Sequence, residues 1–479
     1  NVSNNVKTMK TIVLTMLALC ACASLSAQGD PIAEVKKDHE KPPYIPAAEP
    51  EVRASVAAWQ DLKFGMFIHW GPYSQWGIVE SWSICPEQYA FCMVRPKDKS
   101  YFEYLKEYEA LKTTFNPVQF NPDKWAVAAE NAGMKYVVFT TKHHDGFNMF
   151  DTKYSDYKIT DMHCPFSTHP RANIAKEIFD AFRSRGMMAG AYYSIADWNH
   201  NDYWWDYLPP TDRNINYSPK KFPEKWERLN TFIDNQLNEL TDGSYGPLGM
   251  LWFDLCGASR EMSPQWDRFA RTVRSNQPGI MMVARHMNSI YENYRTPEQR
   301  IPDQALDYPW ESCMTMATQW SYKPHDRYKP ARDILSILVQ IVSRGGNLLL
   351  NVGPGPDGEL DPTAYERLRE IGDWMKVNSE GIYGTKAVAP YKEEKIAFTS
   401  KGNDIYAFYL ADENEKTMPA KVLVRSFVPV DAQGVTLLGY KKPLKWRKVA
   451  DGVEIEIPAS LRNTPPCDYI WGFRMKVRK

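Results

Sequence analysis

Short apolar runs alternate with amphipathic stretches through most of the chain. The apolar runs predict buried strands at residues 64–68, 136–141, 187–193, 249–254, 280–284 and 347–352. Helix-start signals of the Asn, Ser or Asp type with a nearby Pro, and amphipathic spacing, predict helices between them, beginning near residues 121, 173, 225, 263, 331 and 361. This alternation is typical of parallel strands joined by helical crossovers.

Polar or aromatic side chains follow five of these strands, at His69, at His143 and His144, at Tyr193, at Asp254 and at Arg285. In a parallel sheet these carboxyl ends lie at one edge, where barrel enzymes place their sites. No GxGxxG follows the first strand and no P-loop occurs, which argues against a nucleotide-binding sheet. We therefore predict a (β/α)8-like barrel over residues 59–389. The pattern provides six or seven strands, so the eighth is missing or irregular.

Within the stretch Gly249 to Gly257, a short apolar run stops on the carboxylate of Asp254. A bare Asp is costly to bury unless it is used or paired. We interpret Asp254 as a nucleophile at the mouth of the barrel, and the alternative is an Asp that caps the next loop.

Beyond about residue 390 the pattern changes to short alternating strands separated by turn residues. These strands are expected at residues 395–399, 404–410, 421–427, 435–438, 453–457 and 469–475. Such spacing predicts an antiparallel β-sandwich over residues 390–479. It contains no group of chemically reactive residues, so a structural role is favoured over a sugar-binding one.

The amino end has the pattern of an export signal. Lysines precede an apolar run at residues 11–25, which is too short to span a bilayer, and small residues follow. We predict a signal peptide over residues 1–27, starting at Met9, and a periplasmic or extracellular location. A lipid anchor on Cys22 is the alternative. Residues 28–58 are polar and Pro-rich and are interpreted as a linker.

Charge and cysteine content limit the partners. The chain has 58 Lys and Arg against 58 Asp and Glu, so no overall field favours nucleic acid or anionic membranes. The cysteines beyond residue 27 form no CxxC pair, which argues against a zinc cluster. Disulfides are permitted in an exported protein, but spacing does not assign them; Cys85 and Cys92 are the nearest pair.

A retaining glycosidase needs a second carboxyl group roughly 5–5.5 Å from the nucleophile. Glu298 lies in a polar stretch and Glu311 in an apolar one. An apolar setting raises the pKa of a carboxyl group, as a general acid requires. The residues alone leave both candidates open.

Two other function classes also fit the pattern. His69, His143 and His144, with Asp145 and Asp254, could bind a catalytic metal. Adjacent residues on a strand point to opposite faces, however, so His143 and His144 make a poor chelate by themselves. The same imidazoles could bind sugar hydroxyls, and a non-catalytic sugar-binding protein is the third possibility.

Five motifs, in this order along residues 55–390, resemble those of glycoside hydrolase family 29, the α-L-fucosidases. They are Phe64 to Gly71, Lys142 to Phe147, Leu251 to Asp254, Trp310 to Thr315, and Gly345 to Pro354. The resemblance implies a retaining exo-hydrolase that removes terminal α-L-fucose from a fucosylated oligosaccharide or glycoconjugate, with no metal or other cofactor and through a covalent glycosyl-enzyme. It also implies that Asp254 is the nucleophile. Glu298, in Thr296-Pro297-Glu298, resembles the acid/base, and Glu311 remains the alternative.

The same resemblance implies a set of fucose contacts. The matching motifs indicate His69, His143, His144 and Trp252, and looser matches indicate Glu80, Trp82, Tyr193 and Arg285. Ser81 separates Glu80 from Trp82, where the family pairs Glu and Trp directly. A shift of one residue in strand register would replace Tyr193 by Tyr192. Each Trp could equally fill the core.

Overall fold

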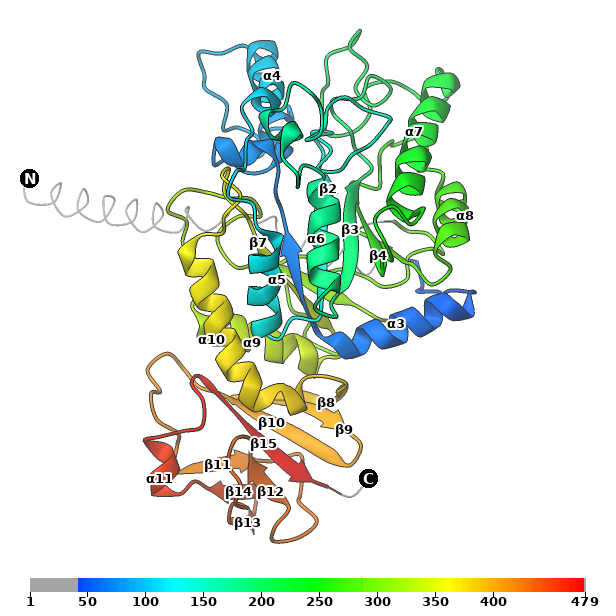
Figure 1. Ribbon diagram of the computed structural model, residues 1–479. Coiled ribbons are helices and arrows are strands. Elements are labelled where there is room, and N and C mark those ends of the chain that lie inside the picture. Colours follow the sequence, from blue (N-terminus) through cyan, green and yellow to red (C-terminus); the bar gives the residue numbers. More distant parts are fainter. Residues whose placement is uncertain (1–41, 286, 478–479) are drawn as a thin grey trace, which may run out of the picture.

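The computed structural model describes residues 42–285 and 287–477 (Figure 1). The expected signal peptide, the alternative anchor at Cys22 and the first part of the expected linker lie outside these residues. No helix within the described ranges is both long and apolar enough to cross a membrane.

Seven parallel strands form a curled sheet in the part of the chain that the structure describes, in the order β5-β4-β3-β2-β1-β7-β6. They are β1 (Phe64–Ile68), β2 (Tyr136–Lys142), β3 (Met188–Ser194), β4 (Met250–Asp254), β5 (Met281–Ala284), β6 (Glu311–Thr315) and β7 (Asn347–Val352). The six expected strands are confirmed. The sequence pattern missed β6 because its residues are mostly polar or small, although all of them are buried.

An irregular segment fills the gap between the edge strands β5 and β6. At one side the amide of Asn293 donates to Met282 O (2.9 Å). At the other side Arg295 and Glu298 form parallel bridges with Trp310 and Cys313. Residues 293–299 therefore occupy the place of the eighth strand, and this arrangement fixes Glu298 beside β6.

Helices cover the outside of the sheet: α5 (Pro122–Asn131), α6 (Ile174–Arg183), α7 (Pro223–Thr241), α8 (Trp266–Asn276), α9 (Ala331–Ser343) and α10 (Pro362–Asn378). Asn121 caps α5 by accepting the Lys124 amide (3.4 Å), and Asp361 caps α10 by accepting the Thr363 amide (2.8 Å), as their sequences predict. The long connection after β1 contains η1 (Pro72–Gln75), η2 (Ser81–Ile84), α4 (Tyr101–Ala110) and η3 (Leu111–Thr113).

Helix α3 (Pro50–Leu62) corrects the expected linker, because residues 50–58 belong to the barrel domain. Its buried positions Val52, Val56 and Trp59 recur at helical spacing. The Trp59 ring stacks on Tyr294, with ring centroids 4.0 Å apart. Trp59 packs with residues of the barrel interior, so α3 covers the amino ends of the strands.

Over the described residues, two antiparallel sheets form the C-terminal domain. One contains β8 (Lys386–Glu393), β9 (Ile396–Lys401), β10 (Asp404–Leu410), β12 (Val435–Leu437) and β15 (Ile470–Lys476); the other contains β11 (Lys421–Val424), β13 (Trp446–Val449) and β14 (Gly452–Glu456). The six expected strands are confirmed. The sequence pattern missed β8 and β13, and β8 begins at Lys386, shortly before the expected start of the domain at residue 390.

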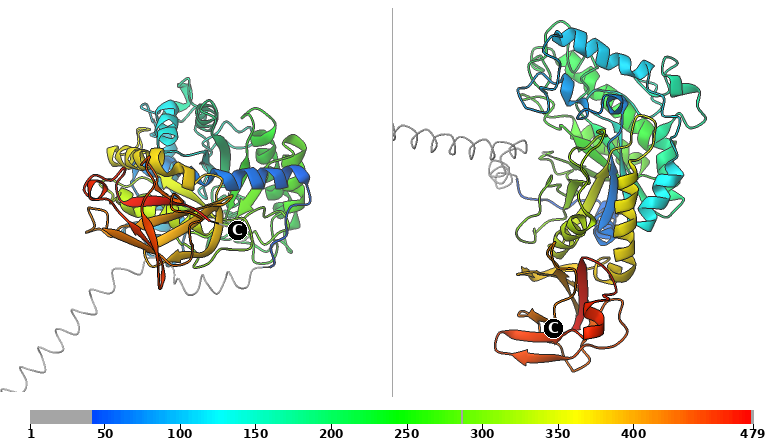
Figure 2. Two further views of the ribbon diagram at one scale, coloured as in Figure 1. Left: turned by 90° about the horizontal axis from the view of Figure 1, so that it is seen from below. Right: turned by 90° about the vertical axis from the view of Figure 1, so that its left-hand side faces the viewer.

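The C-terminal domain packs against α9 and α10, where Trp374 Nε1 donates to Ile470 O (2.8 Å). Figure 2 shows the two domains as successive lobes of an elongated molecule. In Figure 1 the C-terminal domain lies beyond the amino ends of the strands, whereas the loops that follow the strands lie at the opposite end. The sandwich is therefore remote from the edge where the candidate site residues meet.

Alternation along the strands separates two hydrophobic clusters. Phe67, Tyr192 and Trp252 belong to the cluster inside the barrel, whereas Tyr193 and Phe253 belong to the cluster between sheet and helices. Because the side-chain period of a strand is two, Asp254 faces inward with Trp252. The inner face of β4 thus directs the carboxylate of Asp254 into the mouth of the barrel.

Candidate active site

Asp254 is the last residue of β4 and is 7% exposed. One carboxylate oxygen, Oδ1, accepts from the Leu255 amide (2.8 Å) and from Arg285 Nη2 (3.1 Å). The other, Oδ2, accepts from the Tyr192 hydroxyl (3.0 Å) and lies 3.8 Å from His144 Nε2. These partners fix the carboxylate in one orientation.

The same partners determine its ionisation. Burial alone would raise the pKa of Asp254, but the Arg285 guanidinium, then His144 and the Leu255 amide, outweigh it and hold the pKa well below its usual value. Asp254 is therefore ionised at neutral pH, as a nucleophile must be.

Three buried histidines surround this carboxylate, and each ring is fixed by a hydrogen bond at Nδ1. The partners are Asn351 Oδ1 for His69 (2.6 Å), Ser81 Oγ for His143 (2.6 Å) and Ser194 Oγ for His144 (2.7 Å). Burial lowers the pKa of His69 to about 4 and that of His144 to about 3, and it holds the pKa of His143 well below 6.5. The rings are thus neutral at physiological pH and oriented for hydrogen bonding.

Tyr192, and not Tyr193, faces the site, which corrects the expected register. The Tyr193 side chain points outward from the barrel, where its hydroxyl donates to Gln236 Oε1 on α7 (2.6 Å). The sequence pattern did not separate the two because both residues are aromatic and both are fully buried.

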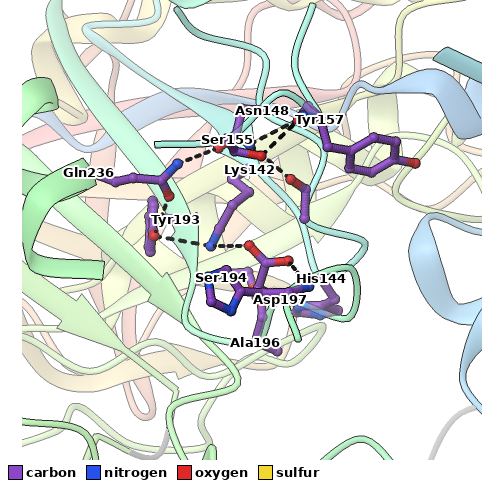
Figure 3. Close-up of polar contacts among 12 residues, drawn as sticks. Lys142, His144, Asn148, Ser155, Tyr157, Tyr193, Ser194, Ala196, Asp197 and Gln236 are labelled. Carbon is purple, nitrogen blue, oxygen red and sulfur yellow. Dashed lines mark hydrogen bonds and ion pairs between the residues drawn. The ribbon is translucent and has the colours of Figure 1, made fainter. Parts of the chain in front are cut away.

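A buried ion pair supports the segment that bears the histidines (Figure 3). Lys142 Nζ donates to Asp197 Oδ2 (3.1 Å) and to the Tyr193 hydroxyl (3.0 Å), and both charged side chains are almost fully buried. The Trp198 amide, next to Asp197, donates to His144 O (2.8 Å). Lys142 and Asp197 therefore join the ends of β2 and β3 directly beneath His144.

Arg285 connects Asp254 to Glu298. Its Nη2 donates to Asp254 Oδ1 (3.1 Å), and its Nη1 forms an ion pair with Glu298. Two nitrogens of one planar guanidinium therefore contact both carboxyl groups, which brings Asp254 and Glu298 to the same side of the barrel mouth. Leu255 and Gln299, the residues after the two acids, have φ of +46° and +53°, an uncommon backbone conformation that is often found at functional sites.

Glu311 lies at the other end of the barrel. It is the first residue of β6, beside the first residue of β7, and accepts hydrogen bonds from the Tyr136 hydroxyl (2.5 Å) and Trp252 Nε1 (3.2 Å). Burial raises its pKa to about 7. Both acceptor oxygens are engaged by residues of the barrel interior, so Glu311 supports Trp252 from below.

The remaining candidates lie between these groups. Trp252 stacks on Tyr192 (ring centroids 5.5 Å apart), and the partly buried Trp82 contacts His144 edge-on (5.2 Å). Glu80 is buried, accepts from the Ser321 amide (2.8 Å), and has its pKa raised by burial to about 7.

Comparison with known proteins identifies the family. The α-L-fucosidase family model matches residues 32–380, and the α-L-fucosidase C-terminal domain model matches residues 390–476. The chain belongs to the α-L-fucosidase family. It is therefore a glycoside hydrolase by family.

Relatives of this fucosidase family align over nearly the whole chain. An α-L-fucosidase from Branchiostoma floridae is 29% identical over 451 residues, which cover 91% of this chain and 96% of the relative. The plasma α-L-fucosidase of Homo sapiens is 28% identical over 457 residues, covering 91% and 93%.

Solved fucosidase structures share the fold. α-L-Fucosidase isoenzyme 1 from Paenibacillus thiaminolyticus has a TM-score of 0.72 and 30% identity, covering 90% of this chain and 100% of that one. The Thermotoga maritima α-fucosidase in complex with a mechanism-based inhibitor has a TM-score of 0.70 and 25% identity, covering 91% and 100%.

Sequence reasoning missed the residues that orient the fucosidase histidines. Ser194 and Asn351 lie at or near the carboxyl ends of β3 and β7, so the rule that found His69 and Asp254 could have found them. Ser81 begins η2 in the long connection after β1, where no strand pattern marks it. Among the described residues, no three His, Cys, Asp or Glu side chains are grouped to hold a metal ion.

The two adjacent tyrosines make a matched test of the register. We expect Tyr192→Phe to lower kcat for a nitrophenyl α-L-fucoside about 10- to 100-fold, because it removes a hydrogen bond of about 1.5–3 kcal/mol to the charged Asp254. Tyr193→Phe should leave kcat within about threefold and instead lower the free energy of unfolding by about 1–3 kcal/mol, since Gln236 loses its buried partner. Steady-state kinetics and urea unfolding check this. Greater loss of turnover in Tyr193→Phe would contradict it.

Proposed function

We propose that this protein is a retaining exo-α-L-fucosidase that hydrolyses terminal α-L-fucose from fucosylated glycans. The observation on which this proposal rests is the bridge that Arg285 makes between an ionised Asp254 and Glu298. Two carboxyl groups that share one guanidinium suit attack by one and proton transfer by the other at the same anomeric carbon, as in a retaining mechanism. The enclosed setting of Asp254 supports binding of a chain end over binding of an internal sugar.

In the first step of the proposed reaction, a carboxylate oxygen of Asp254 attacks C1 of fucose as the bond from C1 to the leaving oxygen breaks. Glu298 gives its proton to that oxygen. In the second step Glu298 takes a proton from a water molecule, the water oxygen bonds to C1, and the Asp254 carboxylate is released. Two displacements at C1 retain the anomeric configuration.

The other residues have binding roles in this proposal. His69, His143 and His144 are neutral and fixed, so they suit hydrogen bonds to the hydroxyl groups of fucose. Tyr192 and Arg285 hold Asp254 in place, and Glu80, Trp82 and Trp252 form the walls around it. The mechanism-based inhibitor bound by the Thermotoga maritima relative supports covalent chemistry at the homologous site.

The place of action is also a proposal. The apolar run at residues 11–25, preceded by lysines, supports export to the periplasm or the outside of the cell. Fucosylated glycans taken up from outside the cell would reach the enzyme there.

Removal of the nucleophile tests the function itself. We expect Asp254→Gly to lower kcat for a nitrophenyl α-L-fucoside by roughly 1,000-fold or more while the protein still unfolds cooperatively. Wild-type activity should survive dialysis against a strong chelator, because the proposed steps use only carboxylates. Near-normal turnover in Asp254→Gly would contradict the proposal. Activity lost to the chelator and restored by zinc would favour a metal hydrolase built on His69, His143 and His144.

Glu298→Ala and Glu311→Ala separate the two acid candidates. Loss of the true acid should slow a fucoside with a poor leaving group at least about 100-fold more than one with a good leaving group, since only the former needs protonation. We expect this for Glu298→Ala, with azide restoring turnover of the good substrate. Glu311→Ala should show similar losses on both substrates together with lower stability, because Tyr136 and Trp252 lose a buried partner. The reverse pattern would assign the acid to Glu311.

A further inference from the structure

The connection after β1 presents a group of aromatic side chains that the proposed chemistry does not use. They belong to residues 85–92, which we call the 85–92 loop. The base of this loop is closed, because the thiols of Cys85 and Cys92 are both buried and close enough to influence each other's ionisation. The Arg95 guanidinium also donates to Ser83 O (2.8 Å), Cys85 O (3.0 Å) and Cys92 O (3.4 Å). The loop is thus held as one unit.

An arginine connects the loop to the active site. The Arg213 guanidinium carbon lies 4.6 Å from the Trp82 ring centroid and 5.5 Å from that of Tyr89. Trp82 in turn contacts His144 edge-on at 5.2 Å, and His144 Nε2 is 3.8 Å from Asp254. A continuous row of side chains therefore leads from the nucleophile out to Tyr89.

Arg213 is fixed and its charge is balanced. Glu87 accepts from Arg213 Nε at Oε1 (2.8 Å) and from Nη2 at Oε2 (2.5 Å). The Arg213 carbonyl accepts from Trp198 Nε1 (3.2 Å) and the Tyr203 hydroxyl (2.8 Å). Because the guanidinium is already paired in bidentate geometry, this surface suits a neutral ligand better than an anionic one.

The outer end of the row is an aromatic surface. Tyr89 is 52% exposed, and its ring is parallel to that of Phe91, with an interplanar angle of 2° and centroids 5.4 Å apart. Phe91 also packs edge-on against Trp82 (5.2 Å). An exposed Tyr in a rigid setting offers a large contact area at low cost in conformational entropy, and the C–H face of a sugar ring can stack on it.

We propose that Tyr89, backed by Phe91 and held by Arg213, is a stacking platform for a neutral sugar of the leaving-group glycan. This inference rests on the proposed function: with fucose enclosed between Asp254 and the buried histidines, the rest of the glycan must extend outward, and the row through Trp82 leads to the 85–92 loop. Tyr89 would then discriminate among fucosylated glycans by the sugar to which the fucose is attached.

Two substrates isolate the platform. α-L-Fucosyl fluoride has no sugar beyond fucose. Neutral trisaccharides with one terminal α-L-fucose, in different linkages, do have further sugars that could reach Tyr89. For the trisaccharide that the wild type cleaves best, Tyr89→Ala should lower kcat/KM about tenfold relative to kcat/KM for the fluoride, the loss expected for truncating one well-packed aromatic contact. Tyr89→Phe keeps the ring and should keep this ratio within about twofold of the wild type. Tyr154→Ala, which removes a tyrosine of similar exposure (46%) elsewhere, is the matched control.

The outcomes separate the platform from the function. An unchanged ratio in Tyr89→Ala would overturn the platform, as would a Tyr89→Phe variant as impaired as Tyr89→Ala. A wild type that cleaves the fluoride but none of the trisaccharides would also overturn it. A wild type that leaves the fluoride intact would contradict the proposed function, and the platform with it.

Discussion

The site depends on one charge, the guanidinium of Arg285, which contacts Asp254 and Glu298 together. The Arg285 side chain is 22% exposed, and a cation in so enclosed a setting is costly unless its charge is balanced, which the Asp254 carboxylate does here. The arrangement requires three parts of the chain to meet: the end of β4, the end of β5 and the irregular segment 293–299. The barrel provides that meeting point because parallel strands bring their carboxyl ends to one edge.

Around this contact, the side chains of the candidate site are held by polar partners and not by apolar packing alone. Each of the three histidines has its Nδ1 engaged, and the pair of Lys142 and Asp197 ties together the two strand ends beneath His144. Breaking such a buried pair leaves an uncompensated charge, so the network favours one conformation of the rim. The same environment sets both ionisation states. Burial keeps the histidines neutral, and Arg285 keeps the carboxylate of Asp254 ionised.

The regular parts of the fold and site could be predicted from the sequence. Asp254, His69 and Arg285 follow apolar strands, and strand ends are where a barrel places its chemistry.

Residues outside such runs could not be placed in this way. Tyr192 and Tyr193 are adjacent aromatics in one buried strand, so alternation did not distinguish the inner from the outer face. β6 has no apolar run, so the sequence pattern did not predict this strand. The position of Glu311 at its amino end could therefore not be predicted either. Residues 50–58 form a helix that is stabilised by packing beneath the barrel, through Val52, Val56 and Trp59. The sequence pattern did not predict this helix because the preceding residues are rich in Pro and the packing partners are distant in the chain.

In the proposed reaction, a carboxylate oxygen of Asp254 bonds to the anomeric carbon of fucose. A 2-deoxy-2-fluoro-α-L-fucosyl donor with a good leaving group slows the second displacement and lets the covalent species accumulate, and peptide mass spectrometry then locates the added sugar. We expect one added sugar per chain, on the peptide that contains Asp254, with the fragment ions placing it on that residue. A label on any other residue, or inactivation without a label, would contradict it.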